Sequence, residues 1–147
     1  MASTGQTTSE VVVEQVGIRC PIGDCKVLQV DPFVGSDVVA GQVYAISNMV
    51  VVALKDCLDG ATDRLVPCAY EIPKLAIGPT FAVKPKASET WTVGTRLGFK
   101  DASDLFLTLA AGYSALAYVL EAKAANASEC LIHFKGDAVA DVAISST

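Results

Sequence analysis

Charged residues are scarce in this chain of 147 residues, at 18% of the total against 52% for hydrophobic residues. The net charge is −5, and the 11 Lys and Arg residues are spread along the sequence rather than clustered. Nucleic acids and anionic membranes are bound by clustered basic side chains, so we expect neither partner. Because the chain is apolar for a soluble protein, we expect part of its apolar surface to meet another protein.

Groups that carry chemistry are also few. His133 is the only histidine, and the sequence has no P-loop and no glycine-rich dinucleotide motif. Asp56, Asp59 and Asp63 share one turn, but they lack the spacing and the closing Glu of a calcium loop. We therefore predict no catalytic residue, no cofactor and no metal.

The five cysteines have no paired CxxC spacing, and their number is odd. Buried free thiols are therefore the expected state. A thiol or metal enzyme that uses Cys20, Cys25 and His133 is a weaker alternative, because two thiols and one distant His make a poor metal site. Cys130 and His133 are three residues apart on a predicted strand, so their side chains are expected on opposite faces.

The chain also lacks a membrane span and a secretory signal. Residues 105–120 carry no charge, but this run is shorter than the roughly 20 residues that a spanning helix needs. Residues 1–10 have neither a basic start nor an apolar centre, so we expect synthesis in the cytoplasm of the producing cell.

Alternating apolar residues favour β-structure, and residues 113–136 show this most clearly. Cys130, Ile132 and Phe134 fall on one side of a strand, while His133 and Lys135 fall on the other. The preceding run, residues 113–121, is apolar on both sides and is expected to be a strand covered on both faces. We predict a hairpin of these two strands.

Further strands are predicted over residues 10–19, 26–30, 38–46, 49–54, 64–72, 91–99 and 105–109. Residues 38–54 fit either a hairpin or one bulged strand. Pro67 predicts an edge position or a bulge, the sequence at Ile72 and Pro73 is expected to end that strand, and residues 105–109 are expected to lie beside residues 113–121. A helix over residues 105–120 is the main rival.

Two segments of the chain are similar to each other. Sliding the sequence by 66 positions places Leu54 on Leu120 and Asp63 on Glu129, and both segments read as strand, small polar turn, acidic residue, strand. We predict an all-β fold, a small β-barrel or β-sandwich built of two similar β units with an extended N-terminal arm. Residues 1–37 form the arm and first short strands, and residues 38–147 form the barrel or sandwich.

Six short motifs follow one another in the second part of the chain: Ala40-Gly41-Gln42-Val43-Tyr44, Val50-Val51-Val52-Ala53-Leu54-Lys55-Asp56, Tyr70-Glu71-Ile72-Pro73-Lys74, Trp91-Thr92-Val93-Gly94-Thr95-Arg96-Leu97-Gly98-Phe99, Ser114-Ala115-Leu116-Ala117-Tyr118-Val119-Leu120-Glu121-Ala122 and Leu131-Ile132-His133-Phe134-Lys135-Gly136. In this order they resemble the capsid decoration, or cement, proteins of tailed bacteriophages. The resemblance covers residues 38–136, and Pro67 departs from it by interrupting a strand that the family leaves unbroken.

The resemblance implies a structural protein without catalytic activity. Its partner would be the major capsid protein on the outer surface of the virion, bound by a homotrimer. The alternative is another virion β-domain, such as a head-fibre base or a tail component. We expect the arm to contact the partner through its apolar residues, Val11, Val12, Val13, Val16 and Ile18, because an extended arm can add a strand to a neighbouring sheet. The alternative for residues 10–19 is an ordinary first strand that pairs with the sheet of its own subunit. Deleting residues 1–19 is expected to weaken binding and leave the core folded.

Overall fold

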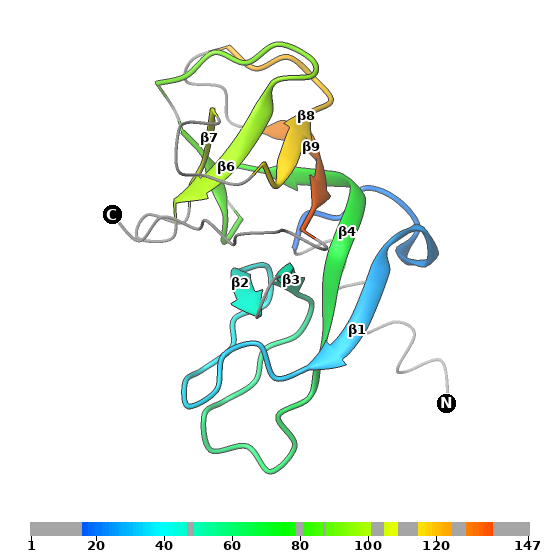
Figure 1. Cartoon of the computed structure of the whole chain (residues 1–147), viewed down its shortest axis with the longest axis vertical. Coiled ribbons are helices and arrows are strands. Elements are labelled where there is room, and N and C mark those ends of the chain that lie inside the picture. Colours follow the sequence, from blue (N-terminus) through cyan, green and yellow to red (C-terminus); the bar gives the residue numbers. More distant parts are fainter. Residues whose placement is uncertain are drawn as a thin grey trace.

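The computed structural model describes residues 16–46, 49–78, 81–86, 88–100, 105–108, 115–124 and 129–136. These residues contain no α-helix, and their only helical turn is the 3-10 helix η1 (Ile22–Asp24). The strands are β1 (Lys26–Val30), β2 (Val43–Ile46), β3 (Met49–Ala53), β4 (Val66–Ile77), β5 (Lys84–Pro85), β6 (Arg96–Lys100), β7 (Leu105–Thr108), β8 (Ala117–Val119) and β9 (Cys130–Lys135) (Figure 1). The predicted all-β fold is confirmed.

All of these strands belong to one sheet, with the order β2-β3-β4-β9-β8-β6-β7-β5 and with β1 paired to β4. Paired strands run antiparallel, except for the parallel pair of β5 and β7. The sheet curls into a half-barrel. β4, which has 12 residues, is the long strand that runs between the lower and upper parts of the molecule in Figure 1.

The first predicted pair of strands forms a tight hairpin rather than one bulged strand. β2 and β3 pair antiparallel from Val43 opposite Val52 to Ile46 opposite Met49. β3 is buried on both faces, which explains its apolar run without alternation.

The hairpin predicted over residues 113–136 is confirmed by the pairing of β8 with β9. Cys130, Ile132 and Phe134 are buried, whereas His133 is half-buried on the other face, as a period of two requires. The expectation that the first strand is covered on both faces is wrong, because Tyr118 is 42% exposed. Its ring stacks on His133, so a cross-strand contact replaces a covering layer.

Two other strand predictions are wrong. β4 does not end at Pro73 but continues to Ile77, and its register with β9 shifts between Ile72 and Leu75. Proline lacks the N–H that a ladder needs, so this irregularity lets the strand pass it. The strands expected to be neighbours, over residues 105–109 and 113–121, correspond to β7 and β8, and these two are not adjacent because β6 pairs with β7 on one side and with β8 on the other. An apolar pattern identifies strands, but it does not identify their neighbours.

The hydrophobic core has two parts, which meet at β3. Val50 and Val52 belong to the larger cluster, which includes Trp91. Val51 and Ala53 belong to the smaller cluster, whose other buried members are Val38, Cys57, Val66 and Cys68. The smaller cluster supports the loops at the lower end of the molecule. No helix among the described residues has the length and hydropathy of a membrane span.

Candidate docking surface

Two loops lie side by side below β2 and β3 in Figure 1. We call residues 31–42 and 54–65, which form these loops, tip 1. Their backbones are joined by a β-bridge: the Val38 N–H donates to the Cys57 carbonyl at 2.7 Å, and the Cys57 N–H donates to the Val38 carbonyl at 3.0 Å. Each loop is therefore held by the other as well as by its own turn.

Carboxylate side chains add two further connections between the loops of tip 1. Asp37 Oδ1 accepts a hydrogen bond of 2.7 Å from the Asp59 N–H. Asp56 Oδ1 accepts one of 2.8 Å from the Ala40 N–H. Aspartate favours such turns because its short side chain can accept from nearby backbone groups. The acidic turns that the sequence displays thus fix the loop geometry.

Arg64 is the main clamp of tip 1. Its guanidinium donates to both oxygens of Asp31, at 3.2 and 3.0 Å, and to three backbone carbonyls. These carbonyls are those of Leu58 at 2.7 Å, and of Phe33 and Ser36 at 2.8 Å each. The hydrogen bond from Arg64 also lowers the pKa of Asp31 below its usual value. A planar guanidinium supplies the many donors that this arrangement needs.

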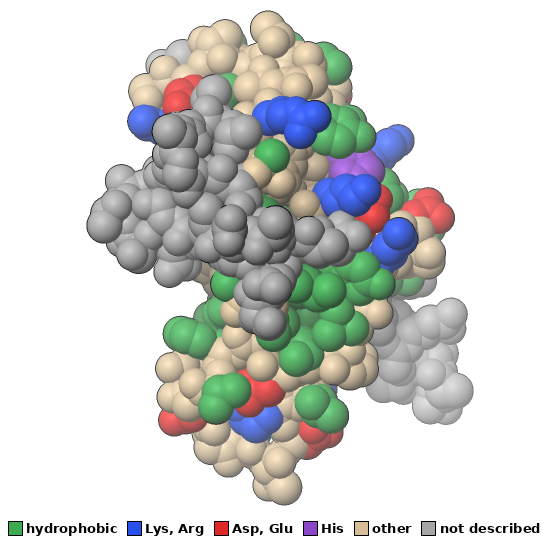
Figure 2. Space-filling model, in the orientation of Figure 1, with side chains coloured by type: hydrophobic (Ala, Val, Ile, Leu, Met, Phe, Trp, Pro, Cys, Tyr) green, Lys and Arg blue, Asp and Glu red, His purple; other side chains and the backbone are tan. Residues whose placement is uncertain are grey.

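The outer surface of tip 1 is apolar to an unusual degree for a pair of loops. Val34 is 82% exposed and Leu58 is 71% exposed. Five of the nine large hydrophobic side chains that are exposed in the described residues belong to this tip: Phe33, Val34, Val39, Leu58 and Leu65. Figure 2 shows separate hydrophobic side chains and acidic groups standing out from the lower end of the molecule. The concentration of exposed apolar side chains on this one pair of loops favours a protein interaction site.

Exposed charges surround these apolar side chains, and most of them are negative. Asp37, Asp56, Asp59 and Asp63 are exposed, and Lys55 is the exposed cation of the same loops. Arg64 is largely neutralised by its ion pair with Asp31 at 3.0 Å. The surface of tip 1 therefore combines apolar contacts with a negative border.

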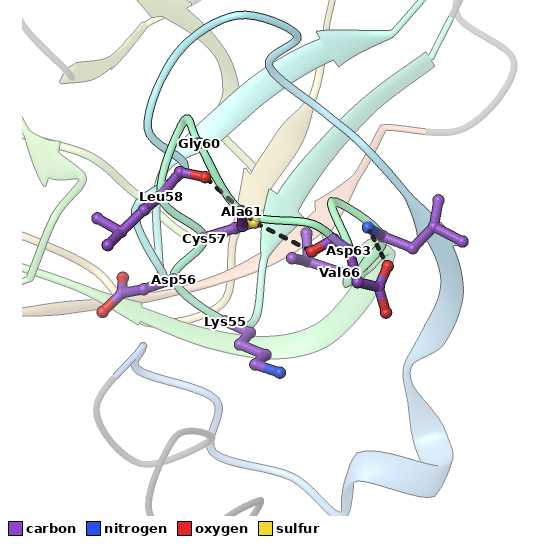
Figure 3. Close-up of a pocket in the computed structure, with 9 residues that line it drawn as sticks. Lys55, Asp56, Cys57, Leu58, Gly60, Ala61, Asp63 and Val66 are labelled. Atoms are coloured by element: carbon purple, nitrogen blue, oxygen red, sulfur yellow. Dashed lines mark hydrogen bonds between the residues drawn. The ribbon is translucent and has the colours of Figure 1, made fainter.

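A hollow of about 570 Å³ opens on tip 1. Leu58, Ala61, Leu65 and Val66 give it apolar walls. In Figure 3 the Cys57 sulfur lies between the carbonyl oxygens of Leu58 at 3.8 Å and Asp63 at 3.6 Å, and the Lys55 and Asp56 side chains point away from it. The hollow is large enough to receive a side chain of a partner.

The model of one protein family, described as phage cement protein, matches this chain over residues 23–134. The match covers tip 1 and the strands from β1 to most of β9. The chain belongs to the phage cement protein family. No curated protein and no solved structure matches the chain. The family resemblance inferred from the six motifs is confirmed, and this family is a structural one rather than a class of enzymes.

The arm residues that the sequence singled out fall into two groups. Val11, Val12 and Val13 lie outside the described residues. Val16 and Ile18 are each 3% exposed and belong to the core of this same chain. Ile18 forms a β-bridge with Leu75 of β4, so the end of the predicted arm strand pairs with the chain's own sheet.

His133 lies away from tip 1, in a polar row across the outer face of the sheet. Its Nε2 atom is 3.2 Å from Glu71 Oε2, and its ring is parallel to that of Tyr118 with centroids 4.9 Å apart. Lys26 Nζ lies 3.5 Å from the other Glu71 oxygen. His133 is thus a member of a cross-strand cluster rather than a freely solvated residue, and it shares no site with Cys130, which is buried on the opposite face.

The two thiols of the predicted turn, Cys20 and Cys25, approach each other. Their sulfur atoms are 3.9 Å apart, and both are free thiols. Among the described residues, no group of three or more His, Cys, Asp or Glu side chains is arranged to hold a metal ion. His133 is not part of this thiol pair.

Sequence reasoning found the turns of tip 1 but not its surface. The sequence predicts that Asp56, Asp59 and Asp63 share a turn, but it assigns no surface role to that turn. A signal was present, because Val34 and Leu58 are large apolar residues within turn sequences. A tight turn offers them no neighbouring strand face on which to be buried, so such residues are expected to be exposed.

Proposed function

We propose that this protein binds the outer surface of a phage head and stabilises the contacts between major capsid subunits. The observation that carries this proposal is the match of the phage cement family over residues 23–134. Tip 1 supports it, because a clamped pair of loops with exposed apolar groups can bind without paying a large ordering cost. The chain has a structural role in this proposal and no catalytic one.

The finer features of the proposal follow from how a cement protein must work. Each contact with the shell can be weak, provided that several are made at once, and an oligomer makes several. The family resemblance implies that this oligomer is a homotrimer. In this proposal Val11, Val12 and Val13 of the N-terminal arm add a strand to a neighbouring subunit, whereas Val16 and Ile18 are buried in the core of their own chain. In this proposal each subunit is built of two similar β units.

A capsid-binding experiment tests this function. Purified protein is titrated into expanded heads that lack it, and binding is measured by co-sedimentation while calorimetry gives the melting temperature of the shell. We expect saturable binding and a melting temperature that rises with protein concentration, as mass action requires. The same protein, unfolded by heat and cooled in the presence of denaturant, is the control.

Two results would contradict the proposal. Failure to bind the heads of the cognate phage would remove the cement function. Immunogold labelling of intact virions on the tail, or at the base of head fibres, would instead support another virion β-domain. Labelling spread over the head surface is the expected result.

A further inference from the structure

Six strands of the sheet are arranged symmetrically. These strands have the order β2-β3-β4-β9-β8-β6 in the sheet. From one edge inward the order is β2, β3, β4, and from the other edge inward it is β6, β8, β9, so each set follows its order in the chain. The two sets meet at the antiparallel pair of β4 and β9, where Glu71 lies directly opposite Lys135. An order of this kind is expected when two copies of one three-stranded unit pack around an approximate two-fold axis.

The registers of the two sets also agree. Val43 pairs with Val52 in the first set, and Arg96 pairs with Tyr118 in the second. Val52 then pairs with Ala69, and Tyr118 pairs with His133. The residues that form these pairs in the first set thus each have one counterpart in the second set, from the first strand to the third.

Hydrogen bonds outside the strands follow the same correspondence. The reciprocal bridge of Val38 with Cys57 has its counterpart in that of Trp91 with Lys123. The N–H of Gly41 donates to Ala53, and the N–H of Gly94 donates to Val119, at 2.7 and 2.9 Å. Both glycines have positive φ, 90° and 89°, a conformation that favours glycine over other residues. The N–H of Leu54 donates to Pro67, and that of Leu120 donates to Leu131.

The loop that precedes the first strand of each set is bound by a cationic side chain through hydrogen bonds to equivalent carbonyls. Arg64 donates to the carbonyls of Phe33 and Ser36, and Lys123 donates to the carbonyls of Lys86 and Glu89. In each loop the later residue of this pair also donates its N–H to the earlier one, at 3.2 Å. The two cations come from different positions in the chain, yet they bind equivalent carbonyls.

These counterparts define a second pair of loops, tip 2, which consists of residues 84–95 and 120–131. The side chains of its described residues differ from those of tip 1. Trp91 and Lys123 fill its interior and are only 1% and 2% exposed, and Val93 is its one exposed large hydrophobic residue. Its remaining described charges, those of Lys84, Lys86, Glu89, Glu121 and Glu129, are mixed in sign. Among the described residues of the two tips, only those of tip 1 combine several exposed apolar groups with a mainly negative border.

We propose that the chain consists of two copies of one β unit and that the first copy's tip is the surface that docks on the major capsid protein. This inference rests on the proposed cement function. The partner surface is an apolar recess or ridge flanked by Lys and Arg side chains. It places its apolar groups against Val34 and Leu58, and its basic groups beside the exposed carboxylates of tip 1.

Charge complementarity selects this partner over a second copy of the same chain. Two copies of tip 1 facing each other would bring Asp37, Asp56, Asp59 and Asp63 of one subunit against those of the other, and such like charges repel. A basic surface gains attraction from the same groups. The binding of tip 1 is therefore expected to weaken as the salt concentration rises.

The two equivalent tips allow a matched experiment. Val34→Lys with Leu58→Lys removes two apolar contacts of tip 1 and adds two positive charges, whereas Val93→Lys makes the same kind of change at one position on tip 2. All three residues are at least 67% exposed, so the variants are expected to fold as the parent does. Binding to expanded heads is measured by co-sedimentation, and self-association is measured by light scattering. We expect at least a tenfold loss of head binding for the double variant and less than a twofold change for Val93→Lys.

Each other result has a definite meaning. If the parent protein does not bind heads, the cement function fails before the variants are compared. If the parent binds and the double variant binds equally well, the docking role of tip 1 is overturned. An equal loss for Val93→Lys would overturn the distinction between the tips. Loss of self-association without loss of head binding would show that a second copy, and not the capsid protein, covers tip 1.

Discussion

Lys123 lies beneath Trp91, with its Nζ atom 4.9 Å from the centroid of the indole ring. The ammonium group is buried at 2% exposure, and it donates hydrogen bonds to the carbonyls of Lys86 and Glu89. Trp91 Nε1 in turn donates to Glu89 Oε1 at 2.9 Å. A buried cation is thus satisfied by two carbonyls and a ring face rather than by a carboxylate partner.

Replacing Lys123 by Met is expected to destabilise the protein. The Met side chain fills the same space but donates no hydrogen bond to the carbonyls of Lys86 and Glu89. Hydrogen bonds from a charged group contribute about 1.5–3 kcal/mol to the free energy of unfolding, and this contribution is lost in the variant. Urea unfolding of the variant measures it, with Lys55→Met on exposed tip 1 as the control. A change below about 0.5 kcal/mol, the usual effect of a surface substitution, would contradict the role assigned to Lys123.

Gly136 to Ala is a second substitution expected to cost stability. The Gly136 carbonyl accepts from the Val50 N–H, and its own N–H donates to Tyr70, each at 2.8 Å. A Cβ at this position would lie 2.8 Å from the Val50 carbonyl carbon and would force β9 away from β3. Overpacking of this kind costs about 1–3 kcal/mol. Gly60→Ala is the control in the same unfolding measurement, because no atom lies within 4 Å of its added Cβ, and equal stability of the two variants would refute the prediction.

Much of the fold could be predicted because local pattern decides it. The alternation of Cys130, Ile132 and Phe134 fixed the buried face of β9, and β1 has the predicted bounds. The continuation of β4 past Pro73 could not be predicted, because a bulge depends on the neighbouring strand that bridges the gap. Similarly, the insertion of β6 between β7 and β8 depends on packing that no single segment contains.

The candidate site was harder to predict than the fold. Arg64 is an ordinary cation in the sequence, and its role as a clamp appears only when residues 31–36 are brought beside it. The sequence similarity placed Leu65 on Leu131, whereas the matching hydrogen bonds place Pro67 there. The connection in the second half is two residues shorter, and a search at one fixed spacing cannot detect this. Val34 and Leu58 can be identified in the sequence as apolar residues within turns, but the sequence does not show that their two loops lie side by side.

Two truncations separate the arm from the core. Removing residues 1–9 is expected to leave stability unchanged, whereas removing residues 1–19 also takes Val16 and Ile18 out of the core. Each buried aliphatic side chain contributes about 1.5–3 kcal/mol, so the longer deletion is expected to cost about 3–6 kcal/mol. It also removes the Gly17 carbonyl, which accepts from the Ala76 N–H at 2.7 Å.

Calorimetry of both truncated proteins measures this difference. The sequence-based expectation that the longer deletion leaves the core folded does not agree with the burial of Val16 and Ile18. A deletion of residues 1–19 that melts at the parent temperature would show that these residues contribute nothing to stability. Because the deletion of residues 1–9 is expected to leave the core intact, any change in its head binding reports the contribution of residues 1–9 themselves.

Three thiols are expected to react slowly with alkylating reagents in the folded protein. Burial raises the pKa of Cys25 to about 12, with the neighbouring Cys20 adding to the effect, and it raises the pKa of Cys68 to about 12. Burial likewise raises the pKa of Cys130 to about 11. The thiolate is the reactive form, and a free cysteine has a pKa of about 8.5, so at pH 8 the thiolate fraction falls by at least about a hundredfold.

Mass spectrometry after timed iodoacetamide treatment measures these rates. The same chain in concentrated urea is the reference, because there the thiols regain the pKa of a free cysteine. Alkylation of Cys25 in the folded protein at the rate of the unfolded chain would show that its thiol is neither buried nor close to Cys20.

The ion pair of Asp31 with Arg64 is expected to make the stability of tip 1 depend on pH. The hydrogen bond from Arg64 lowers the pKa of Asp31 in the folded protein, so the pair contributes stability above the unfolded value of about 3.9. That contribution is lost as the pH falls from there through the lower folded value. Asp31→Asn has no titrating group at this position, so it is expected to be less stable than the parent at pH 6 and to approach the parent as the pH falls below the unfolded value of about 3.9. Urea unfolding at pH 6 and at a series of lower pH values measures this convergence, and Glu129→Gln, a change at an exposed carboxylate, is the control. A difference between parent and Asp31→Asn that stays constant with pH would show that the charge of Asp31 does not stabilise tip 1.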